Sequence, residues 1–240
     1  MSIVVVIPAY NAGRHLRRVV DRVTSAALRA LGRIIIVNDG STDDTRGVVA
    51  ALPAQRCPVQ LIDRPKNGGY GAAMKDGLER ARLDDPDIVA CVHADGQYSP
   101  EALPMLAESM RARRLDLLQG SRIASGTALS GGMPLYKYAA NAVLNRIENA
   151  TLGLAMTDYH SGYLLYGRRT LAEVPFRRLS DSFDFDLEMI AAARARGFAV
   201  AEAPVPTHYG DEVSHLNPIT YGLRVLRVMW NYRRGRYDPN

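Results

Sequence analysis

The first half of the chain alternates short apolar runs with stretches of helical length, and this alternation limits the possible folds more than any other feature. The runs occupy residues 3–7, 33–37, 59–62, 87–92 and 116–120. Their residues are apolar in succession, which is typical of parallel strands that helices cover on both faces. Helical length and composition are found between them, in residues 14–31, 43–52, 71–82 and 100–113. We therefore predict an α/β fold with a mainly parallel sheet and right-handed crossovers.

The bulk composition fits an ordinary globular protein. The chain has 240 residues, of which 47% are hydrophobic, enough to bury the core of a single domain. Cys57 and Cys91 lie in or beside apolar runs without metal-binding or redox spacing, so we expect two reduced cysteines of a cytoplasmic protein. The first apolar run is too short for a secretory signal, and no stretch reaches the ~18 apolar residues that cross a bilayer.

Polar segments, most of them rich in glycine, follow four of the five runs. They are residues 8–11, 38–45, 64–73 and 93–100. Taken singly, each segment could be ordinary turn and helix-cap chemistry. Parallel α/β sheets, however, bind their ligands beyond the carboxyl ends of the strands, where these four segments would meet. Together they predict a binding site at one edge of the sheet.

Five motifs in order resemble the family 2 inverting glycosyltransferases. They read VVVIPAYNAG, IIIVNDGSTDDT, KNGGYGAAMKDGL, HADGQYSPE and LLQGSR. The chain looks most like the branch of dolichyl- and polyprenyl-phosphate sugar transferases, closely over residues 3–122 and more loosely to about 216. The resemblance implies a nucleotide-diphospho-sugar transferase fold of the GT-A type. Independently, no GxGxxG follows the first run, which argues against a dinucleotide-binding domain.

The resemblance also implies a domain organisation. Residues 1–216 would form a single GT-A-like domain, with a nucleotide-sugar-binding half at 1–122 and an acceptor half at 123–216. A basic amphipathic helix would follow at 217–240.

A nucleotide site is implied by the loops after the first three runs and by one residue of the fourth. A carboxylate such as Asp39 can accept hydrogen bonds from a base N–H group, and glycines let a backbone approach a ligand closely. Ala12 stands where the family often has an acid, which leaves the base open. The residues assigned to the nucleotide are Pro8, Ala9, Tyr10, Asn11, Asp39, Lys66, Gly69, Gly71 and Ala94.

A metal site is implied by the segment after the fourth run. In the resembled enzymes this position carries a DxD-type motif, which Asp95 and Gln97 match, whereas His93 replaces the first acid. His93 and Asp95 are two residues apart and would point to the same face of a strand. An imidazole suits Mn²⁺ better than Mg²⁺. We expect Mg²⁺ or Mn²⁺ at Asp95, Gln97 and His93, with His93 alternatively contacting phosphate or filling the core.

Further catalytic residues come from the later motifs. Arg122 resembles an arginine that contacts phosphate in the family, and with the metal at Asp95 it would stabilise the departing diphosphate. Asp184 and Glu188 are four residues apart on an expected helix and share a face. They could act as general base for a hydroxyl acceptor, or only complement the helix dipole. A phosphate acceptor is already anionic and needs no base.

The acceptor half offers four candidates for phosphate or acceptor binding. Lys137 and Asn141 lie one helical turn apart. Tyr209 and His215 stand where polyprenyl-phosphate mannosyltransferases tend to carry Arg and Lys, which argues against a lipid-phosphate acceptor.

The last 22 residues carry five arginines and one acid. Ile219, Leu223, Leu226 and Trp230 recur at spacings of three and four. Such a helix fits docking on an anionic bilayer, but could equally pack on its own domain or contact another subunit of a homo-oligomer. It lacks the aromatic platform or fold signature of a nucleic-acid-binding patch.

These features predict a metal-dependent inverting glycosyltransferase that uses a UDP-, GDP- or dTDP-sugar. The expected acceptor is a polyprenyl phosphate at the cytoplasmic face of the membrane, where the protein would be peripheral. The alternatives are transfer to a soluble small molecule, a nucleotidyltransferase that makes the sugar nucleotide, and a non-catalytic sugar-nucleotide-binding protein. A nucleotidyltransferase would want a Gly-rich, basic loop after the first run, which PAYNAGRHL matches poorly.

Overall fold

The computed structural model describes residues 1–26, 30–53, 57–126, 128–129, 132–206 and 218–239. One seven-stranded sheet runs through them in the order β3-β2-β1-β4-β6-β5-β7. Only β6 is antiparallel to its neighbours, so the predicted mainly parallel sheet is confirmed. The strands are β1 (Ile3–Ala9), β2 (Leu31–Asn38), β3 (Val59–Asp63), β4 (Ile88–Cys91), β5 (Leu117–Ser121), β6 (Leu164–Gly167) and β7 (Val200–Pro204).

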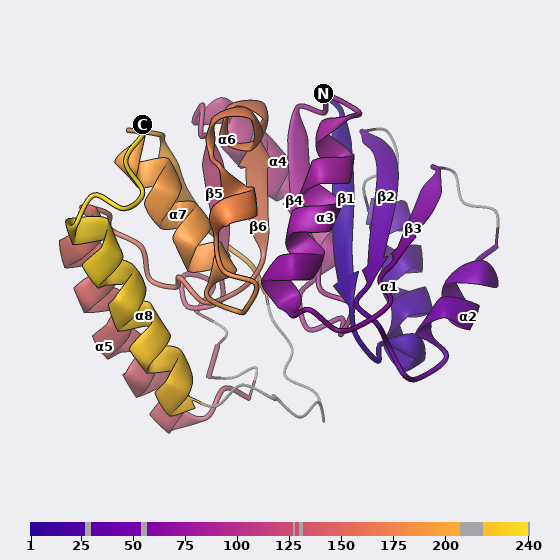
Figure 1. Ribbon diagram of the computed structural model, residues 1–240, viewed down its shortest axis with the longest axis horizontal. Coiled ribbons are helices and arrows are strands. Elements are labelled where there is room, and N and C mark those ends of the chain that lie inside the picture. The colour runs from indigo at the N-terminus through magenta and orange to yellow at the C-terminus, as the bar shows by residue number, and fades with distance from the viewer. Residues whose placement is uncertain (27–29, 54–56, 127, 130–131, 207–217, 240) are drawn as a thin grey trace.

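Helices cover both faces of this sheet (Figure 1). Two 3₁₀ turns, η1 (Pro100–Ala102) and η2 (Phe176–Arg178), accompany them. The α-helices are α1 (Gly13–Ala26), α2 (Thr45–Ala50), α3 (Tyr70–Arg82), α4 (Leu103–Ala112), α5 (Leu135–Leu152), α6 (Arg168–Glu173), α7 (Phe185–Ala195) and α8 (Pro218–Arg233).

The two faces of β1 explain why its sequence shows no polar alternation. Val5 and Ile7 pack into a core formed with α1 and α4, while Val4 and Val6 pack into a second core formed with α3 and α7. Successive side chains of a strand point to opposite faces, and here both faces are buried. Because β2, β1 and β4 run parallel, their carboxyl ends lie at one edge of the sheet, the lower edge in Figure 1, and the loops after them converge there.

Helices α5 and α8 lie side by side at the end of the molecule that holds β7 (Figure 1). Val225, Val228 and Met229 of α8 are buried in the core that α7 helps to form. Leu223, Leu226 and Trp230 lie elsewhere around the helix and are exposed. The side of α8 that the sequence marks as apolar is therefore not the side that packs on the domain. Among the described residues, no helix is long and apolar enough to cross a membrane.

Candidate functional site

The loop after β1 is pinned to the loop after β2 by Asn11. Its side-chain oxygen accepts a hydrogen bond from the backbone N–H of Thr42 at 2.8 Å, and its own N–H donates to the Ser41 hydroxyl at 2.9 Å. Asn11 adopts φ = 50°, a left-handed conformation that asparagine tolerates better than most residues. Tyr10, beside it, is half exposed. The predicted nucleotide residues 8–11 are thus held at the carboxyl edge of the sheet.

Asp39 is buried and holds the glycine-rich loop after β3. Its carboxylate pairs with Arg64 and accepts the backbone N–H groups of Gly68 and Gly69, each at 2.9 Å. The exposed Lys66 belongs to the same loop. Recognition of a base by Asp39 stays a prediction, and the carboxylate would have to share its oxygens between a base and these three partners.

The glycines at the start of α3 receive a segment from far along the chain, residues 180–182. A Cβ atom on Gly69 would collide with the carbonyl oxygen of Asp181, and one on Gly71 would collide with that of Ser180. The backbone N–H of Ala72 donates to the Asp181 carbonyl at 3.2 Å. These two glycines therefore serve close packing between two loops, in addition to any approach to a nucleotide.

The segment after β4 carries Asp95, Gln97 and His93. Asp95 is half buried, and its carboxylate accepts the backbone N–H of Gln97 at 2.9 Å. The His93 ring lies 5.4 Å from the ring of Tyr70 and packs on Gly162, where a Cβ atom would come within 2.5 Å of Nε2. This Nε2 atom is buried and finds no hydrogen-bond partner among the described residues.

A buried nitrogen that lacks a hydrogen-bond partner, two residues before the half-buried Asp95, fits a site that a ligand completes. Within the described ranges, no three His, Cys, Asp or Glu side chains come close enough to form a metal site by themselves. Asp95 and His93 could thus supply part of a coordination shell, and the oxygens of a diphosphate and of water would have to supply the rest. Ala94, which lies between them in the sequence and which the resemblance assigns to the nucleotide, is buried.

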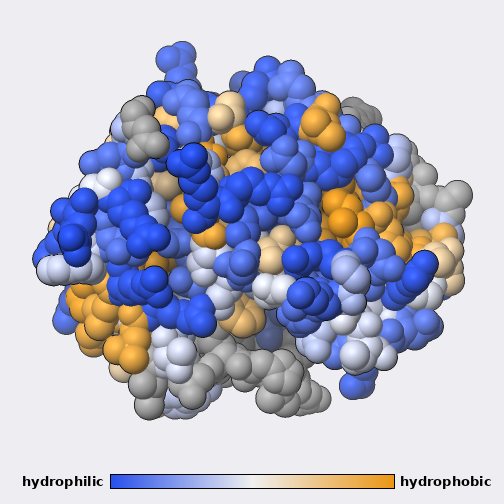
Figure 2. Space-filling model, in the orientation of Figure 1, coloured by the Kyte–Doolittle hydropathy of each residue, from blue (hydrophilic) through white to orange (hydrophobic). Residues whose placement is uncertain are grey.

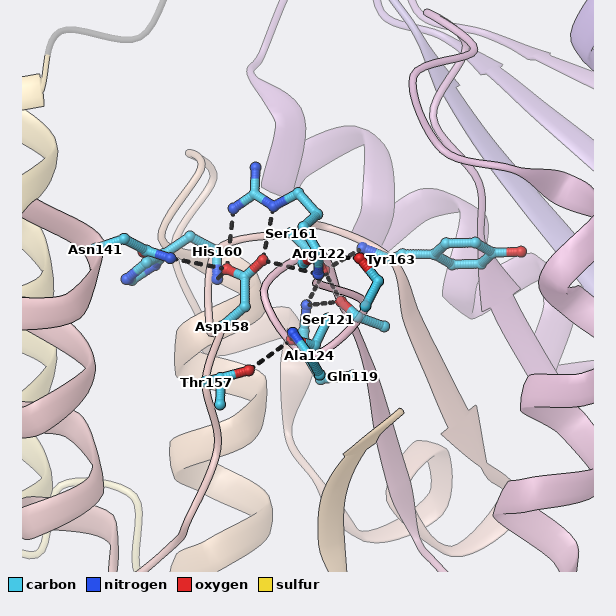
Figure 3. Close-up of polar contacts among 12 residues, drawn as sticks. Gln119, Ser121, Arg122, Ala124, Asn141, Thr157, Asp158, His160, Ser161 and Tyr163 are labelled. Carbon is cyan, nitrogen blue, oxygen red and sulfur yellow. Dashed lines mark hydrogen bonds and ion pairs between the residues drawn. The ribbon is translucent and has the colours of Figure 1, made fainter. Parts of the chain in front are cut away.

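Arg122, at the end of β5, is fixed by the buried Asp158 (Figure 3). Its Nε and Nη2 atoms donate to the two carboxylate oxygens at 2.6 and 2.9 Å. Burial raises the pKa of Asp158, but the charge and hydrogen bonds of Arg122 outweigh it, so the pKa lies below its ordinary value. Asn141 of α5 reaches the same carboxylate at 3.5 Å, so the structure brings two predicted phosphate or acceptor residues together.

The loop that carries Asp158 also connects to α5 and α8 through His160. Its Nδ1 atom lies 2.9 Å from the Tyr221 hydroxyl of α8, and its Nε2 atom lies 3.3 Å from the fully buried Glu148 of α5. The backbone N–H of His160 donates to Asp158 at 3.0 Å. The position of Arg122 therefore depends on both helices.

The predicted acid pair, Asp184 and Glu188 at the start of α7, forms hydrogen bonds with residues 180, 224 and 237. Asp184 accepts from the Ser180 hydroxyl at 2.8 Å and from Arg224 at 3.0 Å. Glu188 accepts from the backbone N–H of Ser180 at 2.5 Å and from the Tyr237 hydroxyl at 2.6 Å. In this structure both acids hold neighbouring segments in place, and the general-base role stays a prediction.

Asp186, between them in sequence, is the acid of α7 that lies near His93, the first residue of the segment 93–97, which we call the strand-end motif. Its carboxylate accepts from the hydroxyl groups of Tyr70 at 2.8 Å and Tyr166 at 3.3 Å. Burial raises its pKa to about 6, and the Tyr70 hydrogen bond and the charge of His93 limit the rise. Sequence reasoning missed Asp186 as a site residue, since nothing in a single sequence sets the rotation of a helix against its sheet.

Three predicted residues cannot be placed. Tyr209 and His215 lie outside the described residues, and the side chain of Lys137 is not described although its backbone belongs to α5.

The chain matches the family model described as glycosyl transferase family 2 over residues 4–174. It is 29% identical over 228 residues to the low-salt glycan biosynthesis hexosyltransferase Agl6 of Haloferax volcanii, which covers 94% of this chain and 52% of that protein. This chain therefore spans about half the length of Agl6. It is also 29% identical over 203 residues to the polyprenol monophosphomannose synthase of Mycolicibacterium smegmatis, covering 84% of this chain and 75% of the relative.

A solved structure has the same fold. Glucosyl-3-phosphoglycerate synthase from Mycobacterium tuberculosis, in complex with uridine diphosphate, superimposes with a TM-score of 0.72 at 18% identity. The match covers 100% of this chain and 81% of that one. A second structure of the same enzyme contains Mn²⁺, uridine diphosphate and glucosyl-3-phosphoglycerate, with a TM-score of 0.71. At this identity the likeness establishes the GT-A-like fold.

Proposed function

Because this chain belongs to glycosyl transferase family 2, we propose that it transfers a hexose from a nucleoside-diphosphate sugar to polyprenyl phosphate, with inversion at the anomeric carbon. The observation that supports the proposal is that hydrogen bonds join the loops after β1, β2 and β3 at one edge of the sheet. The parallel neighbour β4 leads at the same edge into His93, whose Nε2 lacks a partner among the described residues, and Asp95. Relatives named for polyprenol and undecaprenyl-phosphate mannose transfer support the choice of acceptor.

In the proposed reaction a phosphate oxygen of the acceptor attacks the anomeric carbon in line, and the bond from that carbon to the diphosphate breaks. A divalent cation, when bound, supplies Lewis-acid stabilisation of the leaving diphosphate. Asp95 and His93 would hold it, with Gln97 beside them, and the imidazole favours Mn²⁺ over Mg²⁺. Mn²⁺ in the structural neighbour supports a divalent metal. Arg122 would contact the leaving phosphate while its guanidinium stays paired with the buried Asp158.

The engagement of Asp184 and Glu188 favours a phosphate acceptor. Both carboxylates accept hydrogen bonds from Ser180, and each also binds a residue of the C-terminal segment. A hydroxyl acceptor must lose a proton as it attacks and needs a base. An acceptor phosphate is already ionised, so the reaction needs no general base and both acids can hold neighbouring segments instead.

An exposed apolar surface on α5 and α8 supports binding of the protein to a membrane. We call it the α5–α8 surface; the exposed large apolar residues of these two helices are Leu135, Tyr136, Tyr138, Val143, Ile147, Leu223, Leu226 and Trp230. Figure 2 shows hydrophobic atoms gathered at the lower left, over the end of the molecule that these helices occupy in Figure 1. The two helices contain five basic residues and a single acid, Glu148, which is fully buried. Two copies meeting here would oppose like charges, whereas an anionic bilayer complements both the charge and the apolar area.

The membrane proposal predicts that Leu226→Glu and Trp230→Glu each weaken binding to vesicles containing anionic phospholipid by about tenfold or more. Each change replaces apolar area that the bilayer would bury with a charge that it repels. Met105→Glu on α4 is the matched control, because Met105 is 46% exposed and Leu226 is 44% exposed. Co-sedimentation with vesicles measures the effect. Equal binding by wild type and both α8 variants would contradict the proposal.

The proposed function itself is tested by supplying UDP-, GDP- and dTDP-hexoses with undecaprenyl phosphate in detergent, with Mn²⁺ or Mg²⁺. We expect one donor to give a lipid-phosphate sugar detected by mass spectrometry, and chelation of the metal to abolish it. Release of the nucleoside diphosphate only when a soluble acceptor is added would reject the lipid acceptor.

A soluble phosphorylated acceptor is the second candidate. The structural neighbour forms glucosyl-3-phosphoglycerate and matches this chain over its whole length. Tyr209 and His215 also replace two cations that the polyprenyl-phosphate branch tends to carry. 3-Phosphoglycerate is therefore the soluble acceptor to include in the same assay.

A further inference from the structure

An exposed aromatic ring stands at the site without an assigned role. Phe183 is 48% exposed, although it directly precedes the buried start of α7. It follows the segment 180–182, which packs on the glycines at the start of α3. Phe183 is therefore fixed beside the loop that the sequence assigns to the nucleotide. An aromatic side chain held partly in water forgoes its apolar burial, so its position calls for an explanation.

The ring has one ring contact among the described residues. It stacks on Tyr70 with the ring centroids 5.8 Å apart and the planes inclined by 13°. Tyr70 in turn lies 5.4 Å from His93. Two ring contacts therefore connect the exposed Phe183 to His93, which lies two residues before Asp95 in the chain.

Tyr70 is itself held rigidly. Its hydroxyl donates to the buried Asp186 at 2.8 Å and lies 3.6 Å from the sulfur of Cys91. The contact to Asp186 joins the start of α3 to the start of α7, which directly follows Phe183 in the chain. A ring stacked on so constrained a neighbour presents its outer face in a fixed orientation, at little further entropic cost to a ligand.

We propose that the outer face of Phe183 binds the hexose ring of the donor, and that Tyr70 and Asp186 are positioning residues that hold this platform. A hexopyranose carries C–H groups on its ring faces and hydroxyl groups at its rim, so one face can bury apolar area on an aromatic ring while the hydroxyls stay solvated. The inference rests on the proposed function, because it requires a nucleoside-diphosphate sugar at the carboxyl edge of the sheet.

Calorimetric titration with Mn²⁺ tests the platform, using UDP-glucose against UDP, GDP-mannose against GDP and dTDP-glucose against dTDP. Phe183→Ala should bind the sugar nucleotide about tenfold more weakly and the nucleoside diphosphate with unchanged affinity. Phe183→Tyr keeps the ring face and should restore sugar-nucleotide binding. Met105→Ala is the control for loss of a similarly exposed apolar side chain on another face.

The role of Tyr70 is tested by Tyr70→Phe, which keeps the ring and removes the hydrogen bond to Asp186. The change should weaken sugar-nucleotide binding in the wild type and have no further effect in Phe183→Ala, because the platform is then already lost. A merely structural role would weaken both backgrounds equally.

Three results would overturn the inference. Unchanged binding of both ligands by Phe183→Ala rejects the contact, and equal weakening of both assigns Phe183 to the nucleotide instead of the sugar. In either case the wild type still binds the donor, so the proposed function stands. A wild type that binds none of the three pairs rejects the inference and the proposed function together.

Discussion

Asp95→Ala is expected to lower kcat for sugar transfer by at least about a hundredfold, the scale seen when a group that stabilises transition-state charge is removed. Asp95 is the only carboxylate in residues 92–99, the segment that joins β4 to η1. Asp95 is only half buried, and among the described residues its carboxylate accepts a hydrogen bond from the N–H of Gln97 two residues away, so the fold should survive its loss.

The matched control is Asp63→Ala at the end of β3. Asp63 is also a carboxylate at the carboxyl edge, but it pairs with Arg46 and the side chain of Asn38. We expect its kcat to stay within about twofold of the wild type. Steady-state rates at saturating donor and metal, with circular dichroism to verify folding, compare the two. Similar losses in both variants would mean that Asp95 contributes only to local structure.

Arg122→Met is expected to destabilise the protein by about 3–5 kcal/mol at pH 7, because it leaves the buried Asp158 without its cation. The methionine keeps most of the side-chain volume, so the loss reports mainly on charge and hydrogen bonding. Urea unfolding measures the free energy, and sugar transfer should fall in the same variant.

The pH dependence of this loss has a definite sign. With Arg122 present, the pKa of Asp158 in the folded state lies below its unfolded value, so the pair contributes stability above the unfolded pKa and loses it as the pH falls through the folded pKa. Without Arg122, burial raises the pKa of Asp158, and the carboxyl can take up a proton in mild acid. The difference between Arg122→Met and wild type should therefore be smaller at pH 4 than at pH 7.

Arg33→Met is the control for Arg122→Met. Arg33 donates to Asp84 at 2.6 Å, the same distance as the shorter Arg122 bond, but both partners are about a quarter exposed. Arg33→Met should lower the free energy of unfolding by no more than about 1 kcal/mol. Adding Asp158→Asn to Arg122→Met should recover part of the lost stability. If Arg122→Met costs no more than Arg33→Met, the buried pair does not hold the site.

The parallel half of the fold is readable from the sequence because both faces of its strands are buried. Val4 to Ile7 are apolar in succession for this reason, and the predicted runs fall on the observed strands β1 to β5. Strand β6 could not be predicted in the same way. It enters between β4 and β5 in the antiparallel sense, and only the packed structure determines that order.

The site, like the fold, has residues that the sequence locates and contacts that it does not. Asp95, Gln97 and Asn11 lie in the loops that follow β4 and β1, so strand ends and motifs locate them. Their supporting contacts come from far along the chain: Arg122 meets Asp158 across 36 residues, and Tyr70 meets Asp186 across 116. The spacing of Asp184 and Glu188 correctly gives them a common side of α7, since both bind Ser180. That side faces neighbouring segments, and spacing alone carries no information about where it points.

Calorimetric titration of the donor into wild type and Asp95→Ala, each with and without Mn²⁺, tests most directly whether Asp95 delivers a metal to a sugar diphosphate. The account predicts that Mn²⁺ tightens donor binding to the wild type by at least about tenfold, and leaves binding to Asp95→Ala unchanged. An equal gain from Mn²⁺ in both proteins would contradict it.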